Sequence, residues 1–137
     1  MKKILLIFTV LFFNYCSYAQ QKDYRVVFDI SSGDSVSQKA VVREVEIIKS
    51  GNPDAQLEVV VYGQALNMVV KDKSGYGDAI QKLLAMKDVS FKVCSITMKR
   101  NNVDKSQLLA NIEPVPDGIY EIITKQREGW GYIKVAH

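Results

Sequence analysis

Apolar strand-like runs alternate with segments of helical periodicity along most of this chain, and this alternation limits the possible folds more than any other feature. β-branched and aromatic residues dominate a first run at 24–30, and a second apolar strand and a third strand are expected at 57–62 and 89–94. Between them, apolar residues recur at helical spacing over about 36–50 and 77–87. Two of the runs are almost wholly apolar, as expected of strands covered on both faces. The pattern predicts an α/β fold with a mostly parallel sheet and helices on both sides.

Weaker signals complete the order of elements. The stretch 65–70 is expected to be a short apolar turn or helix. Residues 113–115 are expected to form a short strand, which Pro114 and Pro116 would confine to an edge of the sheet. A closing strand is expected at 130–135. The sheet should therefore contain about five strands.

Polar residues mark the expected helix starts. Ser35 and Gln38 match a capping box, in which each side chain accepts a hydrogen bond from a free backbone N–H. Asp104 and Gln107 match the same pattern for a short third helix. Asp117 is the expected cap of a fourth helix. That helix is expected to turn three residues inward: Ile119, Ile122 and Ile123.

The first nineteen residues have the layout of a secretory signal peptide. Lys2 and Lys3 precede an almost wholly apolar run, 4–13, and small residues stand at the cleavage positions of Ser17-Tyr18-Ala19. The run is too short for a membrane span, which needs about 20 residues, so an uncleaved anchor is the weaker interpretation. Lipidation of Cys16 is a further alternative, although large residues precede that cysteine. We therefore expect a signal peptide at 1–19, one domain at 20–137 and a periplasmic or secreted protein.

Cleavage after Ala19 changes the charge balance of the protein. Loss of Lys2 and Lys3 lowers the number of basic residues from 18 to 16, against 15 acidic residues. A near-neutral domain without clusters of Lys and Arg is a poor nucleic-acid binder. It also lacks the polybasic patch that attracts proteins to membranes. We expect neither a nucleic-acid partner nor membrane association after cleavage.

Several common kinds of chemistry are disfavoured by the composition. The only histidine, His137, is the last residue, so a Ser-His-Asp or Cys-His site would depend on the chain terminus. One histidine and one cysteine cannot supply the three or four ligands of a zinc site. The turn after the first strand, 31–34, offers one glycine and an acid, which does not suit phosphate binding. The sequence indicates neither a metal nor an organic cofactor.

Cys94 is the one cysteine that the mature chain keeps, and it is the only candidate for reactive chemistry. It ends the third predicted strand, and ligands of open parallel sheets gather beyond the carboxyl ends of strands. Strand alternation places Cys94 on the more polar face with Ser90 and Lys92. A helical turn that begins at Ser95 would favour the thiolate. The alternative is a structural role, because free cysteines usually pack as small buried hydrophobes.

Four further residues are candidates for a pocket beside Cys94: Asp29, Gly63, Gln64 and Ser95. Each has a simpler interpretation. Gly63 permits a tight turn between a strand and the next segment, and Asp29, like Asp34, suits a loop or a helix cap.

Four segments resemble the DsrE/DsrF-like family of sulfur-relay subunits and their relatives. Tyr24–Asp29 resembles the first strand of the family, and Leu57–Leu66 resembles its second strand with the glycine turn. Val89–Met98 resembles the strand that carries a cysteine in many members, and Glu128–Lys134 resembles the closing strand. The order and spacing of the four segments carry the resemblance, which runs nearly from end to end of the mature chain.

The resemblance implies a three-layer α/β/α sandwich that assembles as an oligomer, often a trimer or hexamer. It also implies that Cys94 carries sulfur as a persulfide, received from a donor protein or passed to an acceptor protein. Relay members are cytoplasmic, whereas this chain has an export signal. The alternative function is a non-catalytic oligomeric binding module in which Cys94 is buried.

Overall fold

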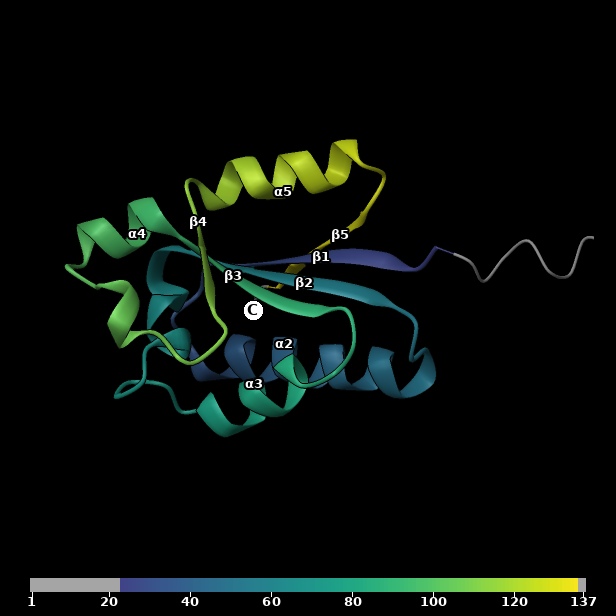
Figure 1. The fold of residues 1–137 in the computed structure, drawn as a ribbon, viewed down its shortest axis with the longest axis horizontal. Coiled ribbons are helices and arrows are strands. Elements are labelled where there is room, and N and C mark those ends of the chain that lie inside the picture. The colour runs from purple at the N-terminus through teal and green to yellow at the C-terminus, as the bar shows by residue number, and fades with distance from the viewer. Residues whose placement is uncertain (1–22, 136–137) are drawn as a thin grey trace, which may run out of the picture.

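The computed structural model describes residues 23–135, so the expected signal peptide and Cys16 lie outside the described residues. Five parallel strands form one sheet in the order β4-β3-β2-β1-β5 (Figure 1). The strands are β1 (Arg25–Ile30), β2 (Gln56–Val61), β3 (Val89–Cys94), β4 (Glu113–Val115) and β5 (Gly131–Val135). The predicted parallel sheet of about five strands is confirmed.

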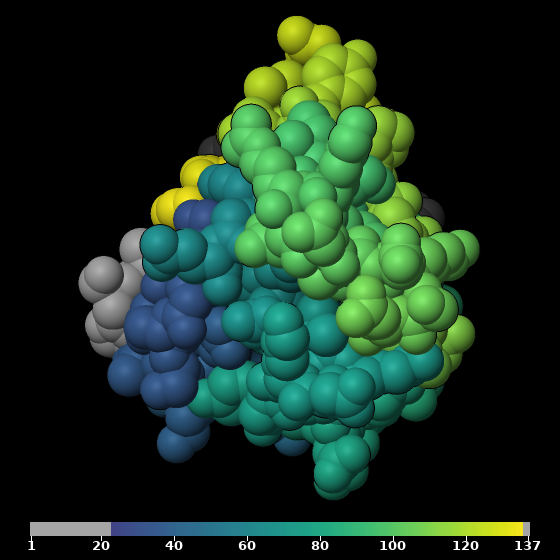
Figure 2. Space-filling model, turned by 90° about the vertical axis from the view of Figure 1, so that its left-hand side faces the viewer, coloured from purple at the N-terminus to yellow at the C-terminus, as the bar shows by residue number. Residues whose placement is uncertain are grey.

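Helices cover both faces of this sheet. Figure 1 shows α2 (Ser35–Gly51) and α3 (Gly77–Leu84) on one face and α5 (Gly118–Arg127) on the other. The predicted three-layer α/β/α sandwich is therefore confirmed. The short helix α4 (Ser95–Arg100) and the 3₁₀ helices η2 (Gly63–Val69) and η3 (Lys105–Gln107) lie at the carboxyl end of the strands. In Figure 2 this end faces the viewer, with the green α4 region between the yellow α5 above and teal segments below.

Carboxylates cap the two long helices that follow turns. Asp34 caps α2, because its side chain accepts hydrogen bonds from the backbone N–H groups of Val36 and Ser37, both at 2.9 Å. The expected capping box of Ser35 and Gln38 is therefore wrong: the helix begins one residue earlier, and Asp34 already occupies the free amides. Asp117 caps α5 as predicted.

The 3₁₀ helix η3 begins with the capping box expected of Asp104 and Gln107. The Gln107 side chain accepts a hydrogen bond from the Asp104 backbone N–H at 2.8 Å. The stretch 65–70, expected as a turn or helix, falls mostly within η2. Of these short segments, η2 follows the carboxyl end of β2, and η3 lies between α4 and β4.

The main hydrophobic core lies between the sheet and the α2/α3 layer. Phe28, Val59 and Phe91 form one cross-strand row on this face, and all three are fully buried. Apolar residues of α2 and α3, such as Val45 and Ile80, cover them. Burying side chains of this size is the main source of stability, at about 1.5–3 kcal/mol each.

The opposite face of the sheet, under α5, is mostly polar. One row across it reads Lys92, Val60, Asp29 and Lys134, and the next pairs Ser90 with Glu58. The apolar contact between α5 and the sheet centres on Val27 and Val60 with Ile122 of the helix. The layer on this side therefore has only a narrow apolar seam.

That narrow seam explains a difference from the prediction for α5. Ile122 is buried, but Ile119 and Ile123, which were expected to face inward, are 54% and 39% exposed. One helix over a polar sheet face has room for a single apolar row, so the flanking isoleucines face solvent. Among residues 23–135, no helix combines the length and the apolar content required to cross a membrane.

Candidate functional site

Cys94 lies where strand β3 ends and helix α4 begins. It is the last residue of β3 and the N-cap of α4, so its side chain sits at the carboxyl edge of the sheet, on the α5 side. Side chains alternate between the two faces of a strand, so the Val93 side chain points into the main core and the Cys94 side chain points to the opposite face. The residue is buried, with 5% of its surface exposed.

Two helix starts converge on the Cys94 thiol. The backbone amides of Ile96 and Thr97 come from α4, and the backbone amide of Gly118 comes from the first residue of α5. Burial raises the pKa of the thiol, but hydrogen bonds from these amides and from the Thr97 hydroxyl outweigh it and bring the pKa below its usual value. The surroundings therefore favour the thiolate.

Thr97 links the cysteine to the turn after β2. Its hydroxyl oxygen accepts a hydrogen bond from the Gly63 backbone N–H at 3.1 Å. That contact holds the hydroxyl near the Cys94 thiol, whose pKa it helps to lower. Gly63 has a φ of +58°, a conformation that glycine adopts without strain. The turn at Gly63 thus takes part in the site through its backbone.

Gly118 is close to the cysteine because it has no side chain. A β-carbon added at this position would lie 3.1 Å from Cβ of Cys94 and 3.2 Å from Cγ1 of Val60. It would also lie 3.6 Å from Cβ of Tyr62. Ordinary contacts between carbon atoms are about 3.5–4.0 Å long, so only glycine lets α5 start this near the sulfur.

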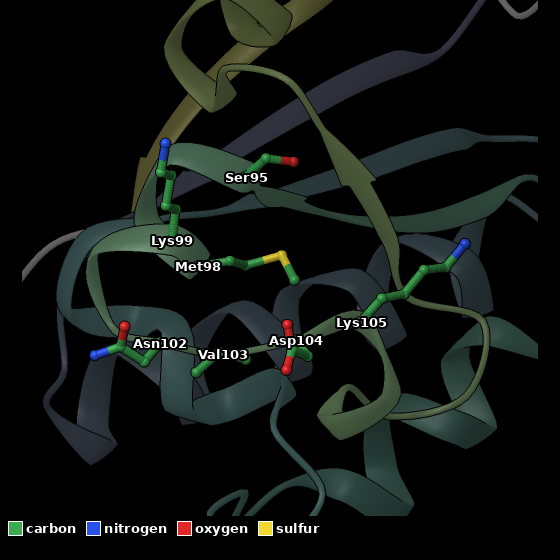
Figure 3. Close-up of a pocket in the computed structure, with 7 residues that line it drawn as sticks. All are labelled: Ser95, Met98, Lys99, Asn102, Val103, Asp104 and Lys105. Atoms are coloured by element: carbon green, nitrogen blue, oxygen red, sulfur yellow. The ribbon is translucent and has the colours of Figure 1, made fainter.

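A hollow lies against α4, starting at the residue that follows the cysteine. It has a volume of about 420 Å³ and is lined by residues of α4, the following turn and η3, as Figure 3 shows. Ser95 lines this hollow, together with Lys99 and Lys105, but Cys94 does not. Of the predicted pocket residues, Ser95 lines this cavity, whereas Asp29, Gly63 and Gln64 do not.

Asp29 and Gln64 do not face the thiol. The buried Asp29 carboxylate accepts hydrogen bonds from the Tyr132 hydroxyl at 2.7 Å and the Lys134 ammonium at 2.8 Å. Gln64 is exposed and lies against the Gly33 turn. Asp29 instead belongs to a polar network between β1 and β5.

Tyr62 connects that network to the cysteine. Its hydroxyl accepts a hydrogen bond from Lys134 at 3.3 Å, while its Cβ lies near Gly118. In the sheet register Tyr62 and Cys94 directly follow the paired residues Val61 and Val93, so they are neighbours. A continuous polar edge therefore runs from the thiol across the ends of β2 and β1 to β5.

Sequence reasoning missed the two residues that most directly surround the sulfur. Thr97 follows Cys94 by three residues, where its amide and hydroxyl return to the strand end once α4 forms. Gly118 follows Asp117, and a glycine just after a helix cap carries no signal of a contact made 24 positions away. Within residues 23–135, no group of three or more His, Cys, Asp or Glu side chains is placed to hold a metal ion.

Comparisons with known proteins agree with this architecture. A protein of unknown function from Methanobacterium thermoautotrophicum, MTH1491, is 31% identical, with a TM-score of 0.77 over 82% of this chain and 99% of that chain. The ychN protein of E. coli shares the fold at 15% identity and a TM-score of 0.65, covering 82% of this chain and 99% of its own. BT1422 of Bacteroides thetaiotaomicron, a conserved protein of unknown function, shares it at 12% identity and a TM-score of 0.69, over 85% and 99% of the two chains.

A search of curated proteins gives no match. The family model of the DsrE/DsrF-like family matches residues 25–135, from the first residue of β1 to the last residue of β5. Every element that builds the thiol site lies inside that match. The chain therefore belongs to the DsrE/DsrF-like family.

Proposed function

We propose that Cys94 is a nucleophilic thiol that carries sulfur as a persulfide. The observation that supports this most strongly is the convergence of backbone amides from α4 and α5 on a thiol whose pKa lies below its usual value. Membership of a family that includes sulfur-relay subunits is consistent with it. A thiolate is the attacking species in sulfur exchange, so the arrangement favours the required form.

The proposed reaction is an exchange with no net oxidation. The Cys94 thiolate attacks the outer sulfur of a donor persulfide, R–S–SH, and forms a new S–S bond. The original S–S bond breaks, and the donor leaves as the thiolate R–S⁻. An acceptor thiolate then attacks the outer sulfur on Cys94, takes it as a persulfide and restores the Cys94 thiolate.

The surroundings of the thiol suit a protein donor or acceptor. Cys94 itself is only 5% exposed, but Ile96 on α4 and Ile119 on α5 are 43% and 54% exposed. Ile96 is the second residue of α4 and Ile119 the second residue of α5, so both closely follow the backbone amides that surround the thiol. An exposed apolar rim of this kind favours docking of another protein surface.

The second candidate function is a non-catalytic binding module in which Cys94 is structural. The small exposed fraction of Cys94 favours this alternative, because buried thiols are usually inert. The two candidates differ in whether the folded protein reacts at its thiol.

The test is intact-mass spectrometry of the folded protein after incubation with a persulfide donor such as glutathione persulfide. We expect a gain of one sulfur atom, reversed by dithiothreitol and absent in Cys94→Ser. Alkylation by iodoacetamide in the native state should occur near neutral pH. A thiol that reacts with neither reagent until the protein is unfolded would overturn the carrier proposal and support the binding module.

We also propose that the chain is exported to the periplasm or secreted, and that it assembles as a homo-oligomer, a trimer or hexamer. The layout of residues 1–19 supports export. Several large apolar side chains that remain exposed on α5 and β5 support assembly. Cell fractionation with N-terminal sequencing tests the first, with Gln20 expected as the first residue. Light scattering coupled to size exclusion tests the second.

A further inference from the structure

The two edges of the sheet are protected very differently. At one edge, β4 has only three residues, and Pro114 and Pro116 limit its ability to accept another strand. At the other edge, β5 has five residues and no proline, and its first four residues are exposed. Tyr132 and Ile133 are 42% and 39% exposed. Within residues 23–135, β1 is the only strand that pairs with β5, so the outer edge of β5 is free.

The lysine of β5 does not guard this edge. Natural edge strands often carry an outward lysine that prevents pairing. The Lys134 ammonium instead turns back over its own sheet, where it donates to Asp29 at 2.8 Å, Ser31 at 3.0 Å and Tyr62 at 3.3 Å. Its three protons are therefore used within the chain, and the charge is balanced by Asp29.

An apolar flank of α5 lies on the same side as this free edge. Lys125, on one flank of the helix, reaches Glu58 of β2 at 3.5 Å. Ile119 and Ile123 are one turn apart on the other flank, by the helical period, and this flank faces β1 and β5. Tyr132 faces the same side, because its partner in the register, Val27, packs against α5. One added strand beside β5 would cover this flank and the free backbone groups together.

We propose that this added strand is β5 of a second copy of the chain, paired antiparallel across a two-fold axis into a continuous ten-stranded sheet. An added strand needs apolar residues on both faces, and β5 itself supplies Tyr132 on the α5 side and Ile133 on the α2 side. A two-fold contact is self-complementary, so the α5 flanks of both copies meet over the joint. Basic and acidic residues are equal in number over residues 23–135, so little net repulsion opposes the contact.

This inference deepens the assembly part of the proposed function and is independent of the chemistry of Cys94. A hexamer with two-fold axes contains such a contact, whereas a cyclic trimer does not. The interface therefore predicts an even number of subunits.

The test is light scattering coupled to size exclusion on the purified protein and on Ile133→Lys, Ile123→Lys and the matched control Ile47→Lys. Ile47 is 55% exposed on α2, so its substitution places the same charge on a surface outside the proposed interface. We expect an even oligomer for the wild type and for Ile47→Lys, and half that mass for the other two variants. Circular dichroism checks that each variant is folded, and the two target residues lie on different elements.

Hydrogen exchange of the wild type provides a measurement that needs no variant. The backbone amides of β5 should exchange more slowly as protein concentration rises through the association range. A wild-type monomer at all concentrations would overturn both this interface and the assembly proposal. An odd oligomer, or an even one that Ile133→Lys and Ile123→Lys leave intact, would overturn the β5 interface alone.

Discussion

Replacing Gly118 with alanine tests whether the start of α5 controls the thiol. The added β-carbon would lie 3.1 Å from Cβ of Cys94 and 3.2 Å from Cγ1 of Val60. Neither atom can move aside easily, because both belong to strand residues and Val60 is fully buried. The first turn of α5 must therefore shift away from β3 and carry the Gly118 N–H away from the sulfur. Overpacking of this kind costs about 1–3 kcal/mol, and the better helix propensity of alanine offsets up to about 1 kcal/mol.

The expected effect on reactivity follows from the lost hydrogen bond. A hydrogen bond to a charged group contributes about 1.5–3 kcal/mol, and about 1.4 kcal/mol is a factor of ten in an equilibrium. At the lower limit, the thiolate fraction near neutral pH falls about tenfold. A more basic thiolate is a better nucleophile by about threefold per tenfold change in acidity, which gives back part of the loss. We expect alkylation near neutral pH to slow by about threefold or more.

The assay is the rate of iodoacetamide alkylation as a function of pH, followed by intact mass. For Gly118→Ala, the rise in rate should move to higher pH. The matched control is Gly51→Ala at the end of α2, where an added β-carbon meets nothing within 4 Å. Its profile should equal that of the wild type. If the folded Gly118→Ala protein also keeps the wild-type profile, the Gly118 amide does not stabilise the thiolate and the reasoning is refuted.

Two further substitutions test the same surroundings, and a third tests a buried carboxylate beneath α5. Thr97→Val should shift the alkylation profile to higher pH. It should also lower the free energy of unfolding in urea by about 1–3 kcal/mol, because it leaves the Gly63 N–H without an acceptor. The control Thr97→Ser keeps the hydroxyl and should leave both the profile and the stability unchanged. Asp117→Ala removes the cap of α5 and should lower the free energy of unfolding by about 1 kcal/mol. It should also move the alkylation profile of Cys94 to higher pH. An unchanged profile would show that the start of α5 does not affect the reactivity of the thiol. Burial raises the pKa of Glu58 despite nearby Lys125, so the folded state holds this proton more tightly than the unfolded state. The wild type should therefore gain stability relative to Glu58→Gln as pH falls from neutral through the folded pKa, and parallel unfolding curves at all pH values would contradict this.

Much of the fold could be predicted because its signals are local. The predicted limits of β3 are those observed, since Val89, Phe91 and Val93 alternate with more polar residues and a turn precedes them. The inward positions of α5 could not be predicted in the same way. Helical spacing shows that Ile119 and Ile123 lie near one side of a helix, but the width of the apolar surface below is set by other strands. Polar residues such as Glu58 occupy that surface, and only tertiary structure shows that α5 covers it.

The position of Cys94 could be predicted from the alternation of one strand, but its chemical surroundings could not. The sequence suggests that the first turn of α4 favours the thiolate, but this turn supplies only some of the amides around the sulfur. The Gly118 amide belongs to α5, which follows β4 much later in the chain. The groups that favour the thiolate lie so close to the sulfur that they also shield it from solvent, and only 5% of the residue is exposed. A lowered pKa and a small exposed surface therefore have one structural cause at this site. Reactivity in the folded state, and its dependence on Gly118, is therefore the property that distinguishes a sulfur carrier from a buried structural cysteine.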